Sequence, residues 1–226
     1  MNGNAQRPLR GVLFDIDGVL VDSKVAIRTA IIDTFRAFGY DPPTDESVDA
    51  LYWATDRMIF EELLPQGTPH RVGLVERMVA FELDLYENKL SRDLVTVGES
   101  VISTLKELKR RGLRLGVVTN NLRRTAMKIL SDFGLLDLFA CVVAADDVSE
   151  TKPSPKPLIE ACLRLGVNAS DAAYVGDSYS DAVAGRMAGL VTILLTRQRE
   201  FDGEIAPDYW ITDLKDLLRL PISAQQ

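Results

Sequence analysis

The chain has 226 residues, of which 46% are hydrophobic and 26% charged, which is the composition of an ordinary globular protein. Its formal net charge of −7 argues against a protein that binds nucleic acid or an anionic membrane through general charge attraction, because such proteins carry an excess of basic side chains. One histidine and two cysteines are too few for a histidine-rich zinc site or a disulfide framework, so any chemistry must come from carboxylates, hydroxyls and lysines.

Apolar stretches along the chain are short. None approaches the roughly 20 residues that a membrane-spanning helix needs, and residues 1–8 have no apolar core of signal-peptide length. We therefore expect a cytoplasmic protein with neither a membrane nor a nucleic acid as its partner.

Apolar runs of strand length recur along the chain and suit strands that are buried on both faces. Helical periodicity of apolar residues follows the later runs, and each predicted helix ends at a glycine. This alternation predicts an α/β fold with a doubly wound, Rossmann-like parallel sheet. The runs are residues 11–14, 113–118, 140–144, 172–175 and 191–195.

The first two runs are separated by far more chain than one crossover needs. Helical patterns fill this interval at residues 27–38, 51–64 and 72–90, with little strand character between them. We predict an α/β core formed by residues 1–21 and 96–226, with residues 22–95 inserted as a helical subdomain.

Polar side chains follow four of the predicted strands. In open α/β sheets, ligands bind beyond the carboxyl ends of the strands, so these side chains are expected to meet at one edge. They offer four carboxylates, a hydroxyl, an amide and an amine. The residues are Asp15, Asp17, Thr119, Asn120, Lys152, Asp177 and Asp181.

The carboxylates of this group predict a cation site. Asp15 and Asp17 are two residues apart, so they face the same side of an extended chain, and Gly18 lets the backbone turn away. With Asp177 they would crowd like charges into one cleft, and a shared Mg²⁺ would relieve that crowding. Lys152 and a hydroxyl beside such an ion suit a phosphate group, so the pattern predicts phosphoryl transfer.

Two roles follow from that chemistry. Asp15 is predicted to be the nucleophile that forms an aspartyl phosphate, which divides one difficult displacement into two steps. Asp17 is predicted to protonate the leaving oxygen and then to activate the attacking water, a contribution of roughly 10²–10⁴ in rate.

Four sequence segments resemble, in order, the motifs of the haloacid dehalogenase-like hydrolase superfamily. They are Asp15-Ile16-Asp17-Gly18-Val19, Thr119-Asn120, Lys152-Pro153 and Gly176-Asp177-Ser178-Tyr179-Ser180-Asp181. The resemblance covers nearly the whole chain. It includes a helical cap inserted after the first motif, as in the branch of phosphoglycolate phosphatases and β-phosphoglucomutases.

The resemblance implies a role for each matched residue. Asp15 would be nucleophile and magnesium ligand, and Asp17 would be acid/base and ligand through its carbonyl oxygen. Thr119 and Asn120 would hold the phosphate, which Lys152 would neutralise. Asp177 would complete the metal site, and Asp181 would join it or would support Lys152.

Several functions remain open at this point. We favour a Mg²⁺-dependent phosphatase of a small phosphorylated metabolite, working as a monomer or homodimer. Asp17 argues against a true dehalogenase, and Gly176 and Asp181 are less typical of a mutase, although a phosphomutase or a pyrophosphatase of the superfamily stays possible. A phospho-accepting receiver domain would have no large cap and a different order of elements.

The substrate must be inferred from the predicted cap. Arg57 lies where this branch often places a residue that faces the active site, and an arginine would suit a carboxylated substrate such as phosphoglycolate. An arginine on a solvated helix surface is an equally good interpretation. Lys24 and Asn121 are weaker candidates for contacts in the pocket.

Overall fold

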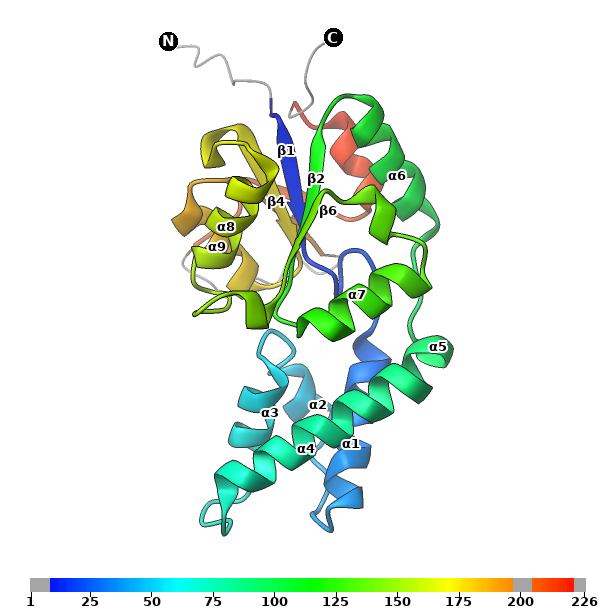
Figure 1. The fold of residues 1–226 in the computed structure, drawn as a ribbon, viewed down its shortest axis with the longest axis vertical. Coiled ribbons are helices and arrows are strands. Elements are labelled where there is room, and N and C mark those ends of the chain that lie inside the picture. Colours follow the sequence, from blue (N-terminus) through cyan, green and yellow to red (C-terminus); the bar gives the residue numbers. More distant parts are fainter. Residues whose placement is uncertain (1–8, 197–204, 222–226) are drawn as a thin grey trace. The chain divides into compact units, whose positions relative to one another are not determined.

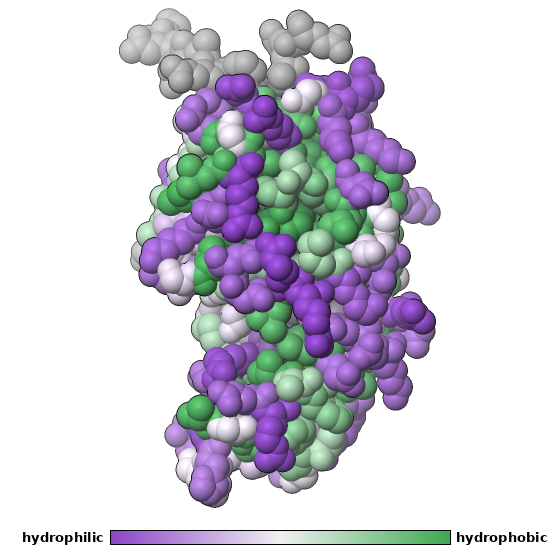
Figure 2. Space-filling model, viewed as in Figure 1, coloured by the Kyte–Doolittle hydropathy of each residue, from purple (hydrophilic) through white to green (hydrophobic). Residues whose placement is uncertain are grey.

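A computed structural model describes residues 9–196 and 205–221. The chain divides into two compact units, one drawn from Met1–Val21 and Val97–Gln226 and the other from Asp22–Thr96. We call the first the core and the second the helical unit (Figure 1). In the described ranges no helix is long and apolar enough to cross a membrane. Figure 2 shows hydrophilic side chains spread over the visible surface of both units.

The core contains a parallel sheet of six strands in the order β3-β2-β1-β4-β5-β6. This confirms the predicted doubly wound fold, and it differs from the 2-1-3-4-5 order of a flavodoxin-like or receiver domain. The two central strands, β1 and β4, are buried throughout, as expected for a sheet covered on both faces. The strands are β1 (Gly11–Phe14), β2 (Arg114–Val118), β3 (Cys141–Val143), β4 (Ala172–Gly176), β5 (Val191–Leu195) and β6 (Tyr209–Ile211).

Helices cover both faces of this sheet. Two of them, α8 and α9, lie together against β1 to β5, while α6 packs beside a short C-terminal helix, η5, on the other side (Figure 1). Leu158, Cys162 and Leu165 of α8 are buried against Leu13 and Tyr174 of the sheet. The core helices are α6 (Glu99–Arg110), α7 (Arg123–Asp132), α8 (Lys156–Leu165), α9 (Tyr179–Ala188) and the 3₁₀ helices η2 (Leu136–Leu138), η3 (Ala145–Asp147), η4 (Ala169–Asp171) and η5 (Leu214–Arg219).

The helical unit has an apolar centre of its own. Phe35, Phe60 and Met78 come from three different helices and are buried together there. The chain enters and leaves the unit side by side, because Asp22 and Thr96 exchange backbone hydrogen bonds of 2.8 and 3.1 Å. Its helices are α1 (Lys24–Ala37), α2 (Asp45–Asp49), α3 (Asp56–Leu63), α4 (Arg71–Leu85), the π-helical turn η1 (Tyr86–Leu90) and α5 (Ser91–Leu94).

Some sequence-based expectations need correction. β6 was not predicted, because three residues at a sheet edge give no periodic signal. Ile159 and Met187 fit the apolar period of their helices, yet they are 44% and 62% exposed. The predicted glycine ends are confirmed; at Gly166, for example, α8 stops in the left-handed conformation with φ of 64°.

Candidate active site

Neighbouring strands bring the predicted site residues to one edge of the core. β1 lies between β2 and β4, and all three run parallel, so their carboxyl ends are adjacent. Asp15 directly follows β1, Thr119 follows β2 and Asp177 follows β4. The sheet order therefore brings together residues that are far apart in the sequence.

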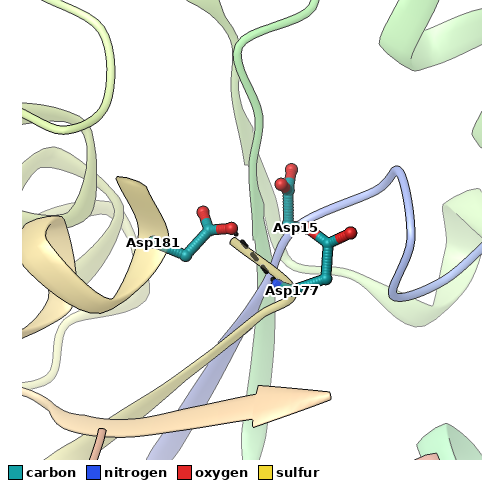
Figure 3. A group of neighbouring side chains, drawn as sticks. All are labelled: Asp15, Asp177 and Asp181. Atoms are coloured by element: carbon teal, nitrogen blue, oxygen red, sulfur yellow. Dashed lines mark hydrogen bonds between the residues drawn. The ribbon is translucent and has the colours of Figure 1, made fainter. Parts of the chain in front are cut away.

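Three carboxylates gather at this edge. One oxygen from each of Asp15, Asp177 and Asp181 lies within 4.8 Å of the corresponding oxygens of the other two. Figure 3 shows Asp15 and Asp177 at the ends of their strands and Asp181 reaching in from α9. Carboxylates so close repel one another unless a positive charge is shared among them.

Lys152 supplies one positive charge. Its side chain is buried, and its Nζ lies 2.7 Å from Asp15 Oδ2 and 2.8 Å from Asp181 Oδ1. Burial alone would lower the lysine pKa, but the two carboxylates outweigh it and raise that pKa, so the amine stays charged.

Asp181 is buried with five donors to its carboxylate. Oδ1 accepts from Lys152 and, at 2.7 Å, from the hydroxyl of Tyr174. Oδ2 accepts from the backbone N–H groups of Asp177 and Ser178 and from the Ser178 hydroxyl, at 3.2, 3.1 and 2.6 Å. Burial disfavours the charged form, yet these partners together hold the Asp181 pKa below its usual value. This environment favours support of Lys152 over direct metal binding, and metal binding by Asp181 remains a prediction.

Tyr174 is a site residue that the sequence analysis missed. It sits on β4 inside an apolar run, so its pattern is that of an ordinary core residue. Its hydroxyl, however, accepts from Lys152 Nζ at 2.9 Å and donates to Asp181. Its position three residues before Asp177 was the only sign of this role in the sequence.

Gly18 allows two of the motifs to approach each other. Its φ is 72°, and a Cβ atom there would lie 1.9 Å from Asp177 Oδ2. Any other residue would be strained and would push Asp177 away.

The charges at this edge suit a divalent cation. Burial raises the pKa of Asp15 to about 7 despite the opposing charge of Lys152. Burial also raises the pKa of Asp177 well above its usual value, with further contributions from Asp181 and Asp15. The cluster thus holds more carboxylate than one lysine can neutralise, and hard oxygen donors of this kind fit Mg²⁺.

Asn120 and Thr119 also lie at this edge. The side chain of Asn120 binds both backbone groups of Lys152: its amide oxygen accepts from the N–H at 3.0 Å, and its amide nitrogen donates to the carbonyl at 3.2 Å. Thr119 is buried, and its Oγ1 accepts from the N–H of Asn121 at 3.1 Å. Asn120 therefore positions Lys152, a contact not predicted from sequence, and its binding of phosphate stays a prediction.

Asp17 lies next to Asp15 with its carboxylate bound by Asn121. The amide nitrogen of Asn121 donates to Asp17 Oδ2 at 2.6 Å. Asn121 is one of the weaker candidates for the pocket that the sequence offers, and in the structure it has Asp17 as a specific partner.

Arg57 belongs to the helical unit. It lies near the start of α3 with its side chain 48% exposed, and it pairs with Glu61 and Glu76 at 3.6 and 3.5 Å. Both partners belong to the helical unit, and the role of Arg57 toward substrate remains a prediction.

Comparison with known families agrees with this geometry. The model of the family described as haloacid dehalogenase-like hydrolase matches residues 12–195. This is most of the chain, and it includes every motif residue described above. The chain therefore belongs to the haloacid dehalogenase-like hydrolase family, which confirms the resemblance found from its motifs.

Individual relatives carry the names of phosphate-releasing enzymes. The chain is 34% identical to a pyrophosphatase PpaX of Halalkalibacterium halodurans, over 92% of this chain and 94% of the relative. It is 31% identical to phosphoglycolate phosphatase 1 of Pseudomonas aeruginosa, over 95% and 80% of the two chains. The crystal structure of CbbY from Rhodobacter sphaeroides in complex with phosphate shares the fold, with a TM-score of 0.78, 24% identity and coverage of 92% and 96%.

Proposed function

We propose that this protein is a Mg²⁺-dependent phosphatase that hydrolyses small phosphomonoesters through an aspartyl phosphate at Asp15. The observation that carries the proposal is the buried cluster at the sheet edge, where Lys152 contacts Asp15 and Asp181 and where Asp177 completes a set of three close carboxylates. Family membership and the names of the relatives support it.

The proposed reaction has two displacements. A carboxylate oxygen of Asp15 attacks the phosphorus, the bond to the leaving oxygen breaks, and Asp17 gives that oxygen a proton. Asp17 then takes a proton from water, the water oxygen attacks the phosphorus, and Asp15 is released with inorganic phosphate. Each cycle restores the protonation of Asp17, so no other reactant is consumed.

The remaining residues stabilise charge in this scheme. Lys152 neutralises phosphoryl oxygens beside Asp15, and Asp181, Tyr174 and Asn120 hold it in place. The carboxylates of Asp15 and Asp177 and the carbonyl of Asp17 would hold Mg²⁺, which would supply further positive charge to stabilise the phosphoryl group.

The direct test is Asp15→Asn. Turnover of an aryl phosphate should fall to the background rate, while Asp132→Asn, at a surface acid paired with Lys128, should leave it unchanged. Acid-quenched Asp17→Asn protein should carry a phosphoryl group on the peptide that contains Asp15. Wild-type turnover by Asp15→Asn would refute the mechanism.

A carboxylated substrate such as phosphoglycolate is the favoured choice, with the helical unit as a cap that selects it. Arg57 supports this, because its two ion pairs are longer than ordinary charge-assisted hydrogen bonds and leave the guanidinium half exposed. Arg57→Ala should raise the KM for phosphoglycolate several-fold more than the KM for an aryl phosphate. Arg36→Ala, at an exposed arginine of α1, is the matched control and should raise neither. Equal changes for the two substrates would contradict the assignment.

Pyrophosphate is the second candidate substrate, favoured by the 34% identical relative named pyrophosphatase PpaX. The ratio of kcat/KM for pyrophosphate to that for phosphoglycolate, both measured with Mg²⁺, decides between the two. A ratio well above one would replace the favoured substrate and leave the role of Asp15 intact.

A further inference from the structure

The hydrogen bond from Asn121 to Asp17 links two turns of the core. Asn121 lies three residues beyond β2, and Asp17 three residues beyond β1, on strands that pair through Phe14 and Val117. The amide nitrogen and Asp17 Oδ2 are 2.6 Å apart, although the two residues are separated by 104 positions in the sequence. A hydrogen bond to a carboxylate is roughly twice as strong as one between neutral groups.

Asn121 is itself held on both sides. Its backbone N–H donates to Thr119 Oγ1 at 3.1 Å, and its carbonyl accepts from the N–H of Ala145 at 2.9 Å. These contacts tie its backbone to β2 and to the segment after β3. The side-chain amide is thus presented to Asp17 from a fixed support, the arrangement needed to orient a reacting group closely.

The donor character of the amide distinguishes the two oxygens of Asp17. An NH₂ group can only donate, so the oxygen that faces it, Oδ2, must accept. The unprotonated oxygen of a carboxyl group is the better acceptor, so this contact favours Oδ1 as the oxygen that carries the proton during the reaction. Loss of this hydrogen bond would remove a contact that distinguishes the two oxygens of Asp17.

We propose that Asn121 is a positioning residue for the general acid and base Asp17: it anchors Oδ2 and thereby directs Oδ1 toward the leaving group. This inference rests on the proposed phosphatase function. It concerns proton delivery to the leaving oxygen, which matters much for an alkyl phosphate and little for an ester whose leaving group departs as a stable anion.

The test compares two substrates that differ in this need. For phosphoglycolate, Asn121→Ala should lower kcat/KM by about 10- to 100-fold, since small misplacements of catalytic groups cost on that order. For p-nitrophenyl phosphate the loss should stay below about 3-fold, because general acid catalysis contributes little there. The ratio kcat/KM is the right quantity, since it reports the steps up to departure of the leaving group. Equal losses for both substrates would overturn the inference.

A second arm tests whether Asn121 acts through Asp17. In an Asp17→Asn background, Asn121→Ala should cause no further loss of kcat/KM for phosphoglycolate. Multiplied losses in the double variant would show an effect independent of Asp17 and would contradict the proposal. Asn121→Asp, which keeps the shape but removes the donor, should lose at least as much as Asn121→Ala on phosphoglycolate.

Asn168 provides a matched control. Its amide donates to Asp171 Oδ2 at 3.0 Å in the turn before β4. This turn is at the amino end of β4, whereas Asp177 of the candidate site follows the carboxyl end. Asn168→Ala removes the same kind of hydrogen bond. It should leave the ratio of kcat/KM for phosphoglycolate to kcat/KM for p-nitrophenyl phosphate unchanged. Failure of the proposed function itself looks different: the wild-type protein would then release phosphate from neither substrate.

Discussion

Two buried carboxylates, one in the core and one in the helical unit, have opposite environments. Asp181 is 0% exposed and Glu82, on α4, is 2% exposed. Five donors surround Asp181, whereas among the described residues Oε2 of Glu82 has no hydrogen-bond partner. The pKa of Asp181 lies below its usual value, while burial raises that of Glu82 well above its own, with Asp56 and Glu87 adding to the shift.

The difference follows from where each residue sits in its secondary structure. Asp181 is in the first turn of α9, where the backbone N–H groups of Asp177 and Ser178 have no partner in the helical hydrogen-bond pattern and donate to it, as does the Ser178 hydroxyl. Glu82 lies inside α4, whose amides are already used by the helix. Asp181 is therefore buried in its charged form and Glu82 in its neutral form, and of these two acids only Asp181 belongs to the proposed chemistry.

The largest expected effect comes from removing the buried lysine of the core, Lys152. Lys152→Met leaves Asp15 and Asp181 buried without their partner and should cost about 3–5 kcal/mol of unfolding free energy, together with all phosphatase activity. Lys156→Met, at an exposed lysine paired with Glu150, should cost less than about 1 kcal/mol. Urea denaturation measures both, and similar losses for the two variants would show that burial of the pair is irrelevant.

Gly176→Ala should displace Asp181 without changing any charge. The new Cβ would lie 2.2 Å from the Cβ of Asp181, so we expect a loss of about 1–3 kcal/mol. In the helical unit, Gly73 of α4 has open space around it, and Gly73→Ala should stabilise by up to about 1 kcal/mol through helix propensity. Thermal melting should show a lower melting temperature for Gly176→Ala and a higher one for Gly73→Ala. An unchanged melting temperature for Gly176→Ala would contradict the close packing of Asp181 against Gly176.

Glu82→Gln tests whether the buried acid of the helical unit is neutral in the folded protein. Because folding raises the pKa of Glu82, the folded protein binds a proton that the unfolded chain releases above its ordinary pKa of 4.5. Wild-type stability should thus fall as pH rises above that value, by at most about 1.4 kcal/mol per pH unit, and the variant should escape this fall. Melting curves across pH measure the difference. Glu62→Gln, at an exposed glutamate, is the control, and its melting temperature relative to wild type should not change with pH. If the melting temperature of Glu82→Gln relative to wild type were also independent of pH, Glu82 would be charged in the folded protein.

Tyr174→Phe should have the smallest effect of the four. It removes one of the five donors to Asp181 and leaves Lys152 in contact, so a loss of about 1 kcal/mol is expected. The activity should fall with little change in KM if Tyr174 acts by holding Lys152. A rise in KM with unchanged kcat would instead assign Tyr174 a role in substrate binding.

Most residues of the candidate site could be predicted from the sequence, but the hydrogen bonds between them could not. Asp15, Thr119, Lys152 and Asp177 were found because residues after buried parallel strands must share an edge. The pairing of Asn120 with the backbone of Lys152 could not be found, since spacing does not show which donor meets which acceptor.

Glu82 shows a second limit of sequence patterns. An acid inside an amphipathic helix resembles a solvated surface residue, and only the packing of the helical unit reveals that Glu82 is buried. Tyr174 was missed for the converse reason, because its ring satisfies the apolar pattern of β4 and conceals the hydroxyl.

The paired backbone of Asp22 and Thr96 has a consequence for how such a protein can change over time. The helical unit starts and finishes at one point, so for the sheet the whole of Asp22–Thr96 is equivalent to a closed loop between β1 and β2. Helices can be lengthened, replaced or recombined beyond that pair while the register of β1 and β2 stays the same. One set of carboxylates at the sheet edge can in this way be inherited intact by chains that differ widely in the inserted part.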